Sequence, residues 1–157
     1  MSGGIKLTER PKQIIILVIL WALMSFMFLV WGGYSLGVLI NMPEWTYPNA
    51  PYVEEILPQI HFGYTMSTIV WLVFSSIFVI IAYATLKPDK WVWTTSLIIS
   101  TIFLAIFGLM LASFIINVLT YFSEFSVLGL VTTIITFIID LGIIFFLTRP
   151  KNKLYFP

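Results

Sequence analysis

The chain of 157 residues contains no cysteine and a single histidine. Without cysteine it has no disulfide, thiolate zinc site, iron–sulfur cluster or catalytic thiol. One histidine excludes a haem held between two imidazoles of this chain. Charged residues make up only 10% of the sequence and the formal net charge is +1, so there is no basic surface for nucleic acid. We expect no cofactor and no nucleic-acid partner.

Apolar side chains dominate what remains. Hydrophobic residues make up 60% of the chain and aromatic residues 17%, and the mean hydropathy is +1.03. A soluble domain is typically about 45–50% apolar and roughly 25% charged. The composition therefore predicts a membrane protein whose principal partner is the lipid bilayer.

The gaps between charged residues locate the spans. Uncharged runs of 31, 31 and 33 residues follow Lys12, Glu55 and Lys90, and the 24 residues between Glu124 and Arg149 hold one charge, Asp140. A membrane-spanning helix needs about 20 apolar residues, so each gap holds one span. We predict an all-α, four-helix bundle that forms a single transmembrane domain over residues 1–157. The predicted spans are about 14–40, 62–86, 91–121 and 125–148.

The basic residues predict the orientation. All eight lie before the first span, between the second and third, or after the fourth. The charged residues of the other two loops are all glutamates. Lys and Arg concentrate on the cytoplasmic side of membrane proteins. We therefore expect a multi-pass protein of the plasma membrane with both termini in the cytoplasm.

The loop between the first two spans has its own pattern. Tyr52, Ile56 and Ile60 recur every four residues, while Glu54 and Glu55 fall on the other side. This period predicts a short amphipathic helix over about 50–60 that lies on the outer membrane surface.

Asp140 is the residue that most suggests a function, because an acid inside a span is costly and usually faces protein or water. Hydroxyl groups of the other helices are expected at its depth, and we expect Asp140 to be protonated or hydrogen-bonded to them. These hydroxyls belong to Ser75, Ser76, Ser100 and Thr101. Thr136, Thr133 and Gly129 share its helix face. Two interpretations stay open: a path for protons or a solute, and a packing surface in which Asp140 joins helices.

Small residues mark further packing faces. They are Gly33 and Gly37 in the first span, and Ala105, Gly108 and Ala112, in line with Thr101, in the third. Small residues at this spacing let membrane helices approach closely, either within the bundle or against another chain.

His61, Glu54 and Glu55 are the only residues of metal-ligand type that cluster in the sequence. One imidazole and loop carboxylates make a weak site. We therefore predict no metal centre.

Near its start the chain has Arg10-Pro11 followed by an Ile/Leu run, and near its end Arg149-Pro150-Lys151 is followed by the aromatic Tyr155-Phe156. These two ends resemble those of small four-helix membrane proteins of archaea and bacteria. The resemblance implies the four-helix layout and no activity, so it supplies no site residue.

Three functional hypotheses follow. The first is a non-catalytic accessory or scaffold subunit of a larger membrane complex, since the chain is small, has few ligand-type residues and has helix faces rich in small residues. The second is a small transporter or proton-conducting module centred on Asp140. The third is a quinone- or metal-binding subunit of a membrane oxidoreductase.

Overall fold

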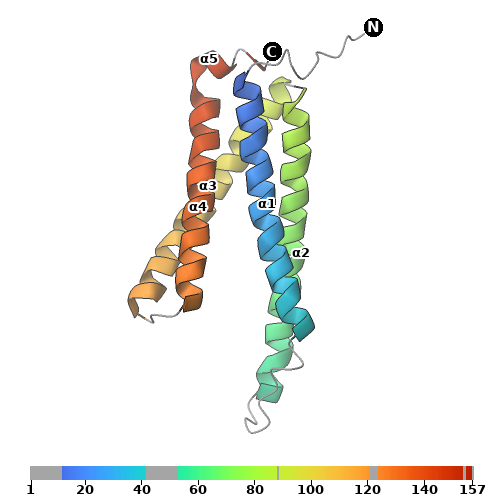
Figure 1. Cartoon of the computed structure of the whole chain (residues 1–157), viewed down its shortest axis with the longest axis vertical. Coiled ribbons are helices and arrows are strands. Elements are labelled where there is room, and N and C mark those ends of the chain that lie inside the picture. Colours follow the sequence, from blue (N-terminus) through green and yellow to red (C-terminus); the bar gives the residue numbers. More distant parts are fainter. Residues whose placement is uncertain (1–11, 42–52, 88, 121–123, 154, 157) are drawn as a thin grey trace. The chain divides into compact units, whose positions relative to one another are not determined.

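In the computed structural model the described residues are 12–41, 53–87, 89–120, 124–153 and 155–156. They form four long helices, α1 (Lys12–Asn41), α2 (Val53–Thr85), α3 (Lys90–Thr120) and α4 (Glu124–Thr148), and one short helix, α5 (Pro150–Lys153) (Figure 1). Each long helix contains a stretch apolar and long enough to cross a membrane. The all-α prediction and the four apolar helices are confirmed, and the helix ends fall close to the predicted ones, except at the start of α2.

Proline and side-chain amides explain where helices end. The residue before a proline disfavours helical conformation, and α4 ends at Thr148, just before Arg149-Pro150. The last carbonyl groups of a helix lack partners within it. Near the end of α1, the Asn41 Nδ2 atom donates to the Gly37 carbonyl oxygen at 2.8 Å.

The start of α2 differs from the prediction. A separate short helix is not seen, because the residues from Val53 belong to the same continuous helix as the second span, which passes through Pro58. Proline removes one backbone hydrogen bond, but Pro58 lies near the helix start, where a single lost bond interrupts little of the helix. Residues 50–52 lie outside the described part of the chain.

The chain groups into two compact units: unit 1 is Met1–Met24 with Val79–Pro157, and unit 2 is Ser25–Phe78. In unit 2, α1 and α2 run antiparallel (Figure 1). The Phe28 ring packs edge-to-face against Trp71, Phe74 and Phe78, with centroids 5.1, 6.0 and 5.0 Å away. Such aromatic pairs are a favourable packing geometry, and they join α1 and α2 within this unit.

Serine hydroxyls also join the two helices of unit 2. The Ser25 hydroxyl donates to the Ser75 carbonyl oxygen and the Ser75 hydroxyl to the Ser25 carbonyl oxygen, both at 3.0 Å. Further along, the Ser67 hydroxyl oxygen accepts a hydrogen bond from Trp71 Nε1 at 2.8 Å and lies 3.2 Å from the Ser35 hydroxyl oxygen. These serine hydroxyls therefore find their hydrogen-bond partners inside the protein, between or within the two helices.

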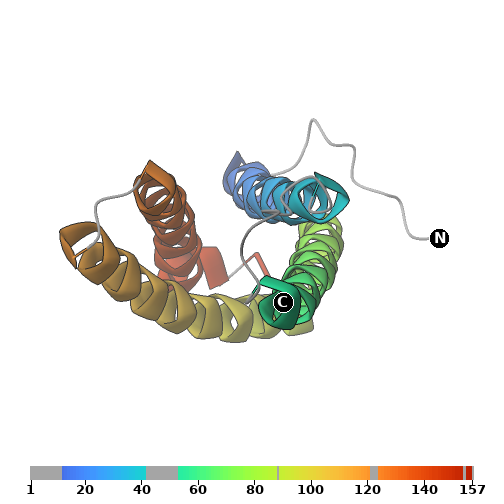
Figure 2. The ribbon, with the colours of Figure 1, turned by 90° about the horizontal axis from the view of Figure 1, so that it is seen from below.

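In unit 1, α3 and α4 lie side by side (Figure 2). The buried face of α4 has residues at alternating steps of four and three, which is the period of a helix packed lengthwise on a neighbour. These residues are Gly129, Thr133, Thr136, Asp140, Ile143 and Leu147. At Gly129 there is no room for a larger side chain, because a Cβ atom placed there would overlap the Phe114 ring of α3.

We predict that Ser25→Ala and Ser75→Ala each lower the free energy of unfolding by about 0.6–1.7 kcal/mol, the range of hydrogen bonds between membrane helices. Because the two hydroxyl oxygens also lie 3.0 Å apart, each single variant already loses this shared contact, and the double variant should lose less than the sum of the single losses. Unfolding in mixed micelles with increasing SDS measures all three.

Ser76→Ala is the matched control, because the Ser76 hydroxyl is exposed and donates only to the Leu72 carbonyl oxygen of its own helix. It should change the stability by less than 0.5 kcal/mol, as is usual for a surface substitution. Strictly additive losses at Ser25 and Ser75 would contradict the reciprocal pair.

Candidate functional site

Asp140 lies in the middle of the buried face of α4, and its side chain has no exposure. The α4 helix places it there because Thr136 is one turn before it and Ile143 one turn after, both buried on the same face. The nearest basic residue of α4's own stretch of chain is Arg149, nine residues and about 14 Å of helix rise away. The carboxyl group is thus enclosed by protein and far from this charge.

The facing surface of α3 supplies hydroxyl groups. Ser96 and Ser100 are both fully buried, one helical turn apart. Ser100 faces the Asp140 carboxyl group, although no hydrogen bond of normal geometry joins them. Asp140, Ser96 and Ser100 form what we call the polar cluster of unit 1.

The hydrogen-bonding capacity of the polar cluster is unused among the described residues. Both carboxyl oxygens of Asp140 and the hydroxyl oxygens of Ser96 and Ser100 are buried without a hydrogen-bond partner. By contrast, the Thr136 hydroxyl is satisfied, since it donates to the Thr132 carbonyl oxygen at 2.8 Å. A buried polar group without a partner costs about 1–3 kcal/mol. The cluster therefore has the chemistry to take up a proton, a water molecule or a small polar solute.

Of the four hydroxyl residues predicted to lie near Asp140, Ser100 faces it. Ser100 lies in the polar cluster, whereas Ser75 is bonded to Ser25 in unit 2. Ser76 and Thr101 are exposed, and their hydroxyls donate to the backbone of their own helices, at Leu72 and Leu97.

The sequence reasoning missed Ser96. Its position four residues before Ser100 places both hydroxyls on one helix face. This spacing could have predicted from the sequence that Ser96 shares the buried face of Ser100.

The small residues predicted to pack helices together differ in whether they contact a neighbouring helix. Gly129 is buried against Phe114, but a Cβ atom added at Gly33 or Gly37 would meet nothing within 4 Å in the described chain. On α3, Ala105 and Ala112 are exposed, and a Cβ atom at Gly108 would lie 4.0 Å from Phe137. The small residues of α4 therefore pack inside the unit, while most of those of α1 and α3 face outward.

The metal-ligand candidates are only partly described. His61 is exposed, and the side chains of Glu54 and Glu55 lie outside the described part. Among the described residues no three His, Asp or Glu side chains come together as they do around a metal ion.

No family model, no curated protein and no solved structure matches the chain.

Proposed function

We propose that the chain is a non-catalytic integral membrane protein that serves as an accessory or scaffold subunit of a larger membrane complex. The observation that supports this is a face of α1 with a glycine notch that the described residues of α2 leave uncovered within unit 2.

This outward face of α1 has the spacing of a helix-pairing surface. Phe26, Val30, Gly33, Gly37 and Ile40 follow one another at alternating steps of four and three residues, the period at which one helix packs lengthwise on another. Phe26, Val30 and Ile40 are between 50% and 68% exposed. Bulky side chains on both sides of two glycines form a notch into which a second helix fits, and small residues let membrane helices come close enough to gain van der Waals contact.

The adjacent glycines of α1 face opposite ways. A Cβ atom at Gly32 would lie 3.0 Å from the Leu72 side chain of α2, whereas one at Gly33 would meet nothing within 4 Å of the described chain. Packing of α1 on α2 therefore uses Gly32 and leaves Gly33 available to another chain.

The proposed setting is the plasma membrane, with both termini in the cytoplasm. The four apolar helices are those of a multi-pass membrane protein, and the positions of the basic residues support the orientation. The acidic residues Glu54 and Glu55 precede the second span in the sequence, and no Lys or Arg lies in the loop between the first two spans, as this orientation predicts for the outer side.

Gly33→Leu should remove the chain from its assembly while leaving its own fold intact. A Cβ atom added at Gly33 meets no described residue within 4 Å, so a leucine there would fill the notch that another helix is proposed to occupy. We expect the fraction of the chain in the larger complex to fall about tenfold, which corresponds to a loss of about 1.4 kcal/mol. Gentle detergent extraction followed by native-size separation measures it.

Gly63→Leu is the matched control, because Gly63 of α2 is also exposed and without a neighbour within 4 Å in the described chain. It should leave the assembly unchanged. Equal co-purification of partners with the Gly33→Leu chain would argue strongly against this interface.

The polar cluster of unit 1 supports a second candidate function, a proton-conducting or transport module. Its basis is the buried carboxyl group of Asp140 with unused hydroxyls beside it. Ionisable residues inside membrane spans commonly mark proton or ion pathways.

Under this second function, Asp140→Asn abolishes proton flux because the amide keeps the shape of the side chain but cannot release a proton. The flux in vesicles that contain the purified chain, followed with an internal pH dye under an imposed potential, should drop to that of protein-free vesicles. Thr101→Ala removes an exposed hydroxyl next to Ser100 and should leave the flux unchanged. Equal flux in the Asp140→Asn and unsubstituted chains would contradict proton conduction through Asp140 and would indicate that Asp140 only packs helices together.

A further inference from the structure

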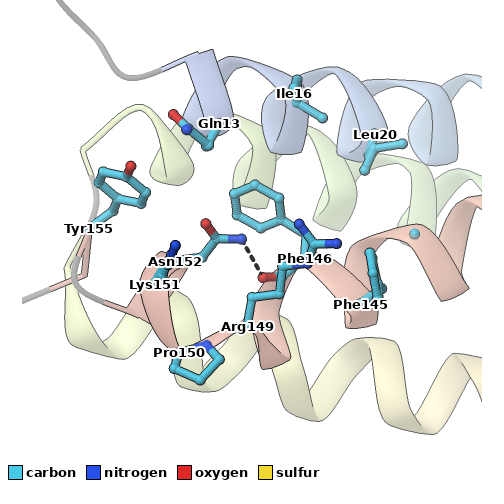
Figure 3. A pocket seen from close by; sticks show the side chains of 11 residues that line it. Gln13, Ile16, Leu20, Phe145, Phe146, Arg149, Pro150, Lys151, Asn152 and Tyr155 are labelled. Carbon is cyan, nitrogen blue, oxygen red and sulfur yellow. Dashed lines mark hydrogen bonds between the residues drawn. The ribbon is translucent and has the colours of Figure 1, made fainter.

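A cavity of about 750 Å³ lies in unit 1, between the first turns of α1 and the end of α4 with α5 (Figure 3). Its size is in the range of ligand sites, about 300–1,000 Å³. Figure 3 shows Leu20 and Phe145 towards one end of it and Lys151 and Tyr155 towards the other. The cavity therefore has an apolar end and a polar end.

The turn after α4 gives the cavity its polar end. Pro150 begins α5 immediately after Arg149, and the Asn152 Nδ2 atom donates to the Phe146 carbonyl oxygen at 2.8 Å. The Asn152 amide is thus used to hold α5 on the end of α4, which leaves Arg149 and Lys151 as the charged groups on the cavity wall. Among the described residues no Asp or Glu lines the cavity, so no described carboxylate there neutralises them.

Arg149 stands at the boundary between the two ends. Its guanidinium carbon lies 4.2 Å from the centroid of the Phe145 ring, a cation–π contact. The planar guanidinium group retains donors for a second partner and matches the geometry of a phosphate group. The apolar wall continues along Ile16 and Phe145, which are 51% and 61% exposed and so open towards the lipid when the helices are inserted.

We propose that this cavity binds an anionic phospholipid. Its phosphate group lies against Arg149 and Lys151, and one acyl chain lies along Ile16, Leu20 and Phe145. Both parts of the cavity are needed for this ligand, since a soluble anion leaves the apolar wall uncovered and a zwitterionic lipid brings its own cation beside the phosphate, which repels Arg149 and Lys151. The position at the end of α4 places the cations at headgroup level, where they attract anionic lipid. The proposal rests on insertion of the helices into a bilayer, and it holds for a subunit and for a transporter alike.

Lipid retention tests the proposal. The chain is incorporated into bilayer discs of equal parts phosphatidylglycerol and phosphatidylcholine, extracted gently, and the lipids that stay bound are counted by native mass spectrometry. We expect phosphatidylglycerol to be retained in preference to phosphatidylcholine. Arg149→Gln should lower its retention about fivefold, and Arg149→Gln with Lys151→Gln about 30-fold, since one cation near an anionic surface contributes about a fivefold factor.

The matched control removes two cations elsewhere on the same unit. Lys87 and Lys90 are exposed between α2 and α3 and do not line the cavity. Lys87→Gln with Lys90→Gln should leave retention within twofold of the unsubstituted chain. An equal loss in this control would show a diffuse effect of surface charge and would overturn the site.

A second variant tests the apolar end without touching a charge. Gly142 lines the cavity, and a Cβ atom there would lie 3.8 Å from the Leu20 side chain. Gly142→Leu therefore projects into the cavity, and we expect it to lower phosphatidylglycerol retention at least tenfold in a chain that keeps its helical content. Unchanged retention in this variant would overturn the proposal.

Inorganic phosphate separates a lipid from a free anion. Added at millimolar concentration, it should not displace the bound phosphatidylglycerol, because it cannot use the apolar wall. Complete displacement by phosphate, or equal retention of both lipids by the unsubstituted chain, would also contradict a lipid site.

Discussion

The need to pair polar groups inside the protein controls this structure. A bilayer offers no water to hydrogen-bond a backbone, so each span is a helix that satisfies its own N–H and C=O groups. Where a helix ends, side chains take over that task. Asn41 donates to the backbone of α1, while Asn152 and the Trp93 Nε1 atom donate to the last carbonyl groups of α4, at Phe146 and Leu147. The Ser25–Ser75 pair meets the same need between α1 and α2.

Against this background the polar cluster of unit 1 is the exception. The Ser25, Ser75 and Thr136 hydroxyls donate to backbone carbonyl groups, yet Ser96, Ser100 and Asp140 keep unused bonding capacity at full burial. A chain that only needed to pack α3 on α4 would be more stable with apolar residues at these positions. The polar cluster therefore lowers the stability of this fold. Buried sites that lower stability in this way are where a function is expected.

The sequence predicted the number and limits of the helices, because a charged residue costs too much inside a span and its position limits the helix. It also predicted the Gly129–Asp140 face of α4, because a period of 3.5 residues is a property of one helix. It could not predict which hydroxyls pair, since that depends on how each helix is rotated about its axis. Ser75 and Ser76 are adjacent, yet only Ser75 faces α1. The same rotation decides that Gly32 contacts α2 and that Gly33 faces away.

The central claim is that four helices of this chain cross a membrane, and single-cysteine labelling tests it most directly. Since the natural chain has no cysteine, an introduced thiol is the only one to react with an impermeant maleimide. We predict that Thr46→Cys is labelled in intact cells, that Asp89→Cys is labelled only after the membrane is opened, and that Ile138→Cys, 60% exposed on α4, stays unlabelled in both. Labelling at position 89 in intact cells, or at position 138 in the opened membrane, would contradict the account.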